Sequence, residues 1–153
     1  MAPTPIAVLG LVDENVQAWK EVFQPDYEVV YHALSPELAT NAFGEVIQGV
    51  APEYFSDAEK AQLTSAPKAF VIVSPSYDNN FLFAAWKITT VTNIHIPVLT
   101  PDPALLGQAE TEGTVLELTP AKDVVERVAK TLKKIAEDPK TEGQEAEQKA
   151  WVY

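Results

Sequence analysis

Short apolar blocks alternate along the chain with segments whose apolar residues recur every three or four positions. The blocks predict strands at residues 6–12, 27–34, 45–50, 70–73, 95–99 and 114–118. The helical spacing predicts helices at residues 14–23, 36–44, 56–63, 81–91, 104–109 and 121–135. Strands that alternate with helices in this way form a mostly parallel sheet with helices on both faces.

The apolar run at residues 70–73 is the block around which the sheet is arranged. Such an uninterrupted run is typical of a strand that is covered on both faces. We therefore predict an α/β fold, a flavodoxin-like or Rossmann-like three-layer sandwich with a mostly parallel sheet of five or six strands. We expect residues 1–135 to form a single domain, followed by a polar C-terminal tail at 136–153.

Several local signals fix where elements begin. Ser35-Pro36 combines a capping residue with proline at the first helical position, and Ser56 with Glu59 matches a capping box. Asp13 is expected to cap the first helix. For the final Trp-Val-Tyr two alternatives stay open: a free end, or an aromatic anchor that docks on this subunit or on a neighbour.

Composition narrows the class of protein. With 153 residues, 46% of them apolar and 22% charged, the chain is typical of a soluble one-domain protein. The net charge of −11 disfavours nucleic acids and anionic membranes as partners. The absence of cysteine excludes disulfides and thiol nucleophiles. No signal peptide or membrane-spanning stretch is recognisable, so we expect a cytoplasmic protein.

The sequence lacks the known phosphate-binding loops. Neither GxGxxG nor GxxxxGK[ST] occurs, and Val12-Asp13-Glu14-Asn15 follows the first strand, where flavodoxin binds phosphate. Carboxylates there would repel a phosphate, so we expect no nucleotide or flavin cofactor. His32 and His95 lack the spacing of metal ligands and are expected to be structural.

Polar residues follow several of the predicted strands. Because the carboxyl ends of parallel strands share one edge of the sheet, ligands bind there in folds of this kind. The candidate ligand-binding residues are Asp13, Glu14, Glu53, Ser74, Ser76, Tyr77, Asp78, Asn79 and Thr100. The acidic members could hold Mg²⁺ or Ca²⁺, or act as acid and base. The favoured interpretation is that each one caps a helix or faces water, and we predict no resident metal.

Residues 46–106 carry a series of motifs in a familiar order. The series runs through Phe55-Ser56-Asp57, Ala66-Pro67-Lys68, Tyr77-Asp78-Asn79 and Ile96-Pro97-Val98 with Thr100-Pro101. It resembles the substrate (catalytic) domain of D-isomer-specific 2-hydroxyacid dehydrogenases. The family's glycine-rich loop is replaced here by Ser74-Pro75-Ser76, and its cofactor domain has no counterpart in this sequence. The resemblance therefore implies a flavodoxin-like domain that is not a complete dehydrogenase.

A weaker resemblance is to the receiver domains of response regulators. Residues 96–100 and 113–120 look like the later strands of a receiver, and Asp13-Glu14 look like its acidic pair. Thr119 stands in place of the receiver lysine, and Ser74 in place of the phosphorylated aspartate. We expect no phosphorylation of the receiver type.

Besides a receiver-like signalling adaptor, two functional hypotheses remain. The first is a stand-alone binding or interaction module that docks a protein partner or a second copy through the helix at 81–91 or the final Trp-Val-Tyr. This helix is apolar nearly all round, so its apolar surface is larger than one face of the sheet can cover. The alternative is an enzyme that acts on a small polar substrate at the carboxyl ends of the strands, with an acidic site that a divalent metal could assist.

Overall fold

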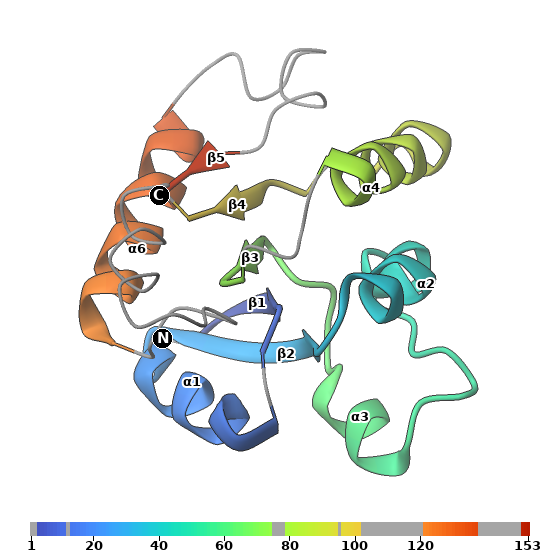
Figure 1. The fold of residues 1–153 in the computed structure, drawn as a ribbon, viewed down its shortest axis with the longest axis horizontal. Helices are drawn as coiled ribbons and strands as arrows, with labels where there is room; N and C mark the ends of the chain where they lie inside the picture. The colour runs from blue at the N-terminus through green and yellow to red at the C-terminus, as the bar shows by residue number, and fades with distance from the viewer. Residues whose placement is uncertain (1–2, 12, 75–78, 95, 102–120, 138–150) are drawn as a thin grey trace, which may run out of the picture.

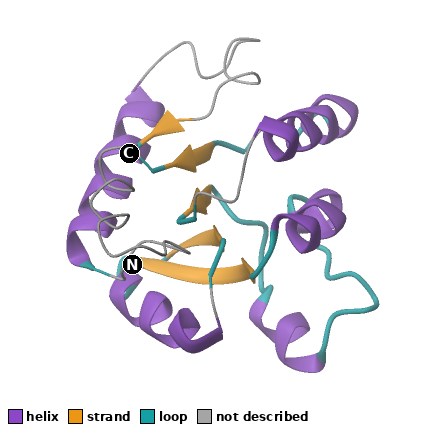
Figure 2. Cartoon of the chain, in the orientation of Figure 1, coloured by secondary structure: helices purple, strands orange, loops and turns teal. Residues whose placement is uncertain are grey.

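The structure is a computed structural model, and it describes residues 3–11, 13–74, 79–94, 96–101, 121–137 and 151–153. Within these ranges five strands form one sheet, and helices cover both of its faces (Figure 1 and Figure 2). The strands are β1 (Thr4–Leu9), β2 (Tyr27–Ala33), β3 (Phe70–Ile72), β4 (Val98–Thr100) and β5 (Trp151–Val152). The helices are η1 (Asp13–Asn15), α1 (Val16–Phe23), α2 (Pro36–Val46), α3 (Asp57–Gln62), α4 (Asn79–Thr92) and α6 (Lys122–Glu137).

The strands are all parallel and lie in the order β2-β1-β3-β4-β5. This is the flavodoxin-like order, so the predicted fold class is confirmed. The apolar run at residues 70–73 supplies β3, which lies between β1 and β4 in the middle of the sheet. A single apolar block thus correctly identified the central strand.

Two hydrophobic clusters pack on opposite faces of the sheet. Phe70 and Ile72 of β3 point toward α2 and α4, where the Phe43 ring stacks on the Phe70 ring with centroids 4.7 Å apart. Val71 points to the other face and packs with Trp19 of α1 and residues of α6. Each fully buried side chain of this size stabilises the fold by about 1.5–3 kcal/mol. The fold therefore has the predicted three layers (Figure 1).

The predicted strand at 45–50 is wrong. Helix α2 continues past Gly44 to Val46, and residues 47–49 form a turn. Gly49 has a φ of 74°, and the N–H groups of Gly49 and Val50 donate to the carbonyls of Val46 and Glu45. Val46 and Ile47 read as strand residues because they are β-branched, but here they supply the buried face at the end of a helix.

Two of the three predicted caps are confirmed. Ser35 Oγ accepts from the Leu38 N–H at 3.3 Å, and Ser56 exchanges both capping-box bonds with Glu59, at 3.1 and 3.2 Å. The first helix differs from the prediction, because residues 13–15 form the 3₁₀ helix η1 and Asn15 takes the N-cap position of α1. Asp13 is therefore not the N-cap residue of α1.

The final residues of the sequence belong to the sheet. Trp151 and Val152 pair with Leu99 and Thr100 of β4, and the Tyr153 N–H donates to the Thr100 carbonyl at 3.0 Å. Of the two alternatives for this segment, the anchor on the same subunit is the one found. Helix α6 ends at Glu137, two residues past the expected domain boundary. The predicted helix at 104–109 and strand at 114–118 lie outside the described residues.

The Tyr153 side chain replaces a backbone donor that is missing from the hydrogen-bond ladder between β3 and β4. The Phe70 N–H donates to the Pro97 carbonyl, so the next ladder donor to the Ile72 carbonyl would be the N–H of residue 101. That residue is Pro101, which has no N–H. The Tyr153 hydroxyl donates to the Ile72 carbonyl instead. The buried Tyr153 ring thus fastens β5 across β4 to the central strand.

Candidate functional site

The order of the strands places a topological switch point at the carboxyl edge of the sheet. The chain moves outward from β1 to β2 and then returns to β3, so the topological switch point lies between β1 and β3. Leu9 pairs with Ile72, and the Val73 N–H donates to the Leu9 carbonyl at 3.0 Å. Gly10 and Ser74 therefore follow neighbouring strand ends at this point. Ligands bind at such switch points in open α/β sheets.

The backbone after β1 is turned toward β2. Gly10 has a φ of 93°, a conformation that favours glycine. The N–H groups of Gly10 and Leu11 both donate to the Ala33 carbonyl, at 2.8 and 3.2 Å. These two donors are therefore used within the sheet and are not directed at a ligand.

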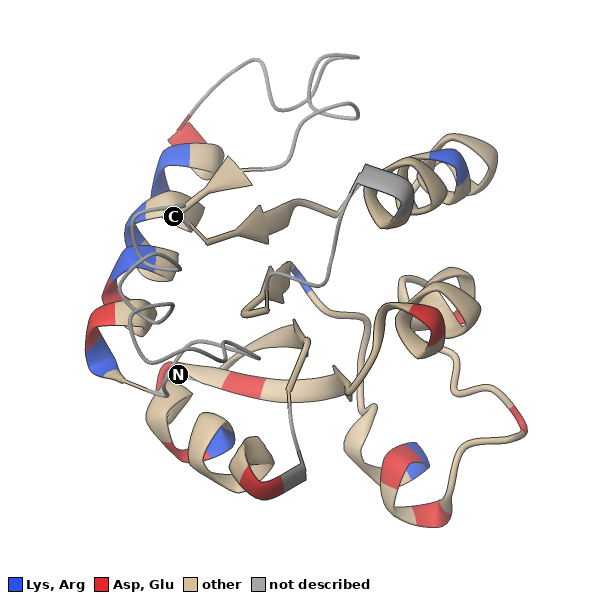
Figure 3. Ribbon diagram, viewed as in Figure 1, with Lys and Arg blue, Asp and Glu red and all other residues tan. Residues whose placement is uncertain are grey.

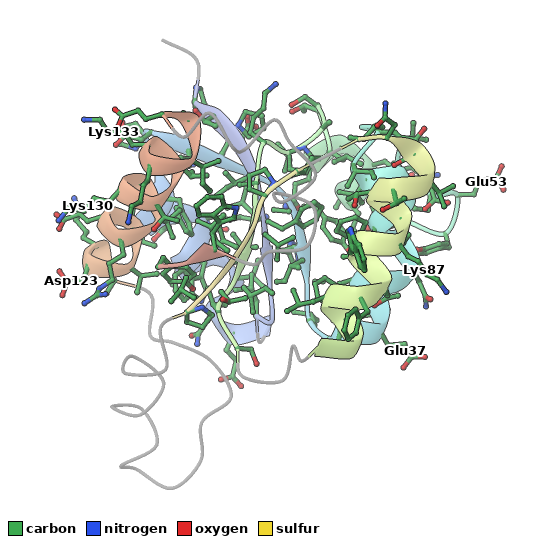
Figure 4. All side chains as sticks on the ribbon, turned by 90° about the horizontal axis from the view of Figure 1, so that it is seen from above. Glu37, Glu53, Lys87, Asp123, Lys130 and Lys133 are labelled. Atoms are coloured by element: carbon green, nitrogen blue, oxygen red, sulfur yellow. The ribbon has the colours of Figure 1, made fainter. Side chains whose placement is uncertain are left out.

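The acidic candidates that the structure describes do not gather at one place. Asp13 and Glu14 lie in η1, directly after β1, and Glu14 is exposed. Glu53 was assigned to this edge because a strand was predicted before it. It lies instead in the connection between α2 and α3 and projects outward (Figure 4). Nowhere in the described chain do three or more His, Asp or Glu side chains come together as metal ligands would.

The remaining candidates fall into three groups. Ser74 is buried at 3% exposure directly after β3, and Thr100 is the half-buried last residue of β4. Asn79 is the first residue of α4. Ser76, Tyr77 and Asp78 lie outside the described residues. At the switch point the described part of the site therefore consists of Gly10, Leu11, Glu14 and Ser74.

His32 takes part in a contact between β2 and α3. The Gln62 side-chain amide donates to the Val29 carbonyl at 3.0 Å and lies 3.2 Å from His32 Nδ1. With the amide as donor, Nδ1 is the acceptor. This contact agrees with the expected structural role of His32, while His95 lies outside the described residues.

A second candidate surface is the outer face of α4. Phe81 and Ala85 are buried against the sheet, whereas Phe83 is 62% exposed and Val91 is 84% exposed. Phe83, Lys87 and Val91 follow one another at four-residue spacing and therefore form a single outer row. The predicted helix is thus buried on one face, and in the isolated chain its opposite face presents apolar side chains to water.

Trp86 occupies the flank of the same helix. Its indole N–H is buried and has no hydrogen-bond partner within the part of the chain that the structure describes. A buried donor without a partner is uncommon, because it loses its bond to water without replacement. Helix α4 therefore carries a hydrogen-bond donor without a partner among the described residues, the Trp86 indole N–H, beside the exposed row of Phe83, Lys87 and Val91.

The opposite side of the sheet has a different character. The outer surface of α6 is lined with charged residues, and Lys130 and Lys133 project away from the sheet (Figure 3 and Figure 4). Its apolar side chains Val124 and Val128 are buried against α1 and the sheet. In the ranges that the structure describes, no helix combines the length and apolar character needed to cross a bilayer.

Comparisons of the chain with protein-family models, curated proteins and solved structures gave no match. The resemblance to the dehydrogenase substrate domain therefore depends on the sequence motifs alone.

Sequence reasoning missed the exposed side chains around α2 and α3, among them Leu38 and Tyr54. The only signal in the sequence that could have identified them is an apolar residue at a position outside the buried face of its helix, or within a loop.

Proposed function

We propose that the chain is a protein-binding module with a flavodoxin-like fold, which docks its partner on the side formed by α2, α3 and α4. One observation carries this proposal: the large exposed hydrophobic side chains of the described residues all lie on that side. Six are in or beside these helices, and Val152 points to the same face because it pairs with Thr100. They are Leu34, Leu38, Val50, Tyr54, Phe83, Val91 and Val152.

The distribution is more informative than the exposure itself. Scattered exposed hydrophobic residues are normal, but apolar side chains concentrated on one side mark an interaction surface. The described residues of α1 and α6 carry no exposed large hydrophobic side chain. Burying the row on α4 against a partner would gain about 25 cal/mol for each Å² of apolar surface removed from water.

The test compares variants that change opposite sides of the sheet. Phe83→Ser with Val91→Ser removes the apolar row on α4, and Lys130→Ser with Lys133→Ser is the matched control on α6. Each tagged chain is recovered from extracts of the source cells. We expect the wild type and the control to retain a stoichiometric partner, either another protein or a second copy.

The α4 variant should retain at least about tenfold less partner, because truncation of an interface hot-spot residue costs about 2 kcal/mol or more. Melting temperatures verify that both variants fold. A wild-type chain that is recovered alone and sediments as a monomer contradicts the proposal, and so does equal retention by the two variants.

A second candidate function is an enzyme or binding protein for a small polar molecule at the switch point. The position of the buried Ser74 favours this function. Ser74 follows the end of β3, next to the end of β1, and ligands bind at this place in folds of this kind. The test is a thermal-shift panel of 2-hydroxy and 2-keto acids with and without Mg²⁺. A ligand at 100 times its Kd should add roughly 2.7 kcal/mol to the free energy of unfolding. No shift with any of them contradicts this alternative.

A further inference from the structure

An exposed aromatic ring stands on a buried aromatic pair between α2 and α3. Phe55 stacks on Tyr31 with centroids 5.8 Å apart and planes at 3°, and both side chains are buried. The Tyr54 ring meets Phe55 edge-on at 5.4 Å and is 65% exposed. The Tyr31 hydroxyl lies 3.5 Å from the Leu38 carbonyl, which ties the pair to the start of α2. The packing beneath Tyr54 therefore holds a large ring at the surface.

Two carboxylates lie near this ring, and one of them, that of Glu59, accepts from the N–H of Ser56, two residues after Tyr54, at 3.1 Å. Partial burial raises the pKa of Tyr54, and the negative charges of Glu45 and Glu59 raise it further. Both glutamates are exposed, one on α2 and the other on α3. Between residues 36 and 62 the chain carries five acidic residues and one basic residue. Carboxylates on both α2 and α3 thus act on the ring.

The charge of the whole molecule acts in the same direction. The net charge is −11, which draws cationic partners toward the chain. Two helices are exceptions: α6 has five basic and three acidic residues, and the only charged residue of α4 is Lys87. Helix α6 lies on the opposite side of the sheet from α2 (Figure 3). Figure 4 shows Glu37, Glu53 and Lys87 on one side and Asp123, Lys130 and Lys133 on the other, so acidic residues predominate on the first side and basic residues on the second.

We infer that the Tyr54 ring and the carboxylates of Glu45 and Glu59 bind a lysine or arginine side chain from a basic segment of a protein partner. The inference rests on the proposed function and names the chemistry of its partner. A cation over an aromatic face is attracted by the ring quadrupole, and the carboxylates pair with its charge. A purely apolar partner would leave the carboxylates buried without a counter-charge.

A second copy of the chain fits this surface less well than a basic partner. Two molecules that each carry −11 repel one another, and the surplus of +2 on α6 is small against that repulsion. The inference therefore commits to a different protein with clustered Lys or Arg residues.

The test uses a labelled, capped peptide of four Gly-Lys repeats and its Gly-Gln analogue, followed by fluorescence anisotropy in low salt. We expect the lysine peptide to bind and the glutamine peptide not to bind. Tyr54→Leu keeps an apolar side chain but removes the ring face, and it should raise the Kd about threefold. Binding of both peptides, or an unchanged Kd for Tyr54→Leu, overturns the inference.

A charge-matched pair separates local recognition from the overall field. Glu45→Gln with Glu59→Gln and Glu21→Gln with Asp26→Asn both change the net charge from −11 to −9, and glutamine can still serve in the capping box. We expect the first pair to raise the Kd at least fivefold more than the second. Equal effects of the two pairs overturn the inference. If the α4-dependent complex persists in that case, the proposed function stands without it.

Discussion

At the scale of single residues, the Ile72 carbonyl shows how a distant residue supplies the donor that a proline in the neighbouring chain segment cannot. Pro101 cannot donate to it, and a buried carbonyl without a donor costs about 1–3 kcal/mol. The Tyr153 hydroxyl, 81 positions away along the chain, supplies that donor. The C-terminal strand therefore completes the hydrogen bonding of the central strand.

Tyr153→Phe should lower the free energy of unfolding by about 1–3 kcal/mol, because the ring stays in place while the Ile72 carbonyl loses its donor. Urea unfolding at pH 7 measures the change. Tyr54→Phe is the control, since this hydroxyl is exposed, and its effect should be within about 0.5 kcal/mol. Equal effects of the two substitutions would contradict the proposed role of Tyr153.

The same variant should change how stability depends on alkaline pH. Burial raises the pKa of Tyr153, and burial with the charges of Tyr54 and Glu59 raises the pKa of Tyr31. These tyrosines keep their protons in the fold while the unfolded chain loses them above pH about 10. Stability is therefore fully present below pH about 10 and falls by about 1.4 kcal/mol per pH unit for each tyrosine above it.

Tyr153→Phe removes one of these ionisable hydroxyls. Between pH 10 and 12 its free energy of unfolding should therefore fall less steeply with pH than that of the wild type, by about 1.4 kcal/mol per pH unit. Urea unfolding at pH 10, 11 and 12 gives both slopes. Parallel slopes would show that the Tyr153 hydroxyl ionises as readily in the fold as in the unfolded chain.

At the scale of elements, local signals predicted where helices begin. They did not predict where α2 ends or that residues 151–152 form a strand of the sheet. Ser35 and Ser56 act through bonds within three residues, so their roles can be read from the sequence. The β-branched residues at 46–47 were misread because the bonds that end α2 depend on a positive φ at Gly49. The strand Trp151–Val152 was left open because its partner β4 is about fifty residues away.

Two glycines near the end of α2 give opposite predictions. A Cβ at Gly44 would lie 3.7 Å from Ile88 Cγ2, an ordinary contact, so Gly44→Ala should stabilise the protein by about 0.5–1 kcal/mol. A Cβ at Gly49 would lie 3.0 Å from the Ala66 nitrogen at a φ of 74°, so Gly49→Ala should destabilise it by about 1–2 kcal/mol. Urea unfolding of both variants checks the signs, and changes of the same sign would contradict this account of α2.

At the scale of the whole molecule, the two sides of the sheet differ in both charge and apolar exposure. The alternation of strands and helices was enough to predict the fold class, because it determines the layers and the parallel sheet. It could not predict which apolar residues stay exposed, since Phe83 and Phe81 lie two positions apart and differ only in the face they occupy. The placement of Glu53 at the carboxyl edge was wrong, because it depended on a predicted strand at 45–50 where α2 ends and the chain turns.

Hydrogen exchange of the chain alone and in its purified complex tests the proposed docking side most directly. We predict slower exchange in the complex at α4 and at residues 50–59, with α6 unchanged. Protection confined to α1 and α6 would contradict the assignment of the docking face to the side formed by α2, α3 and α4.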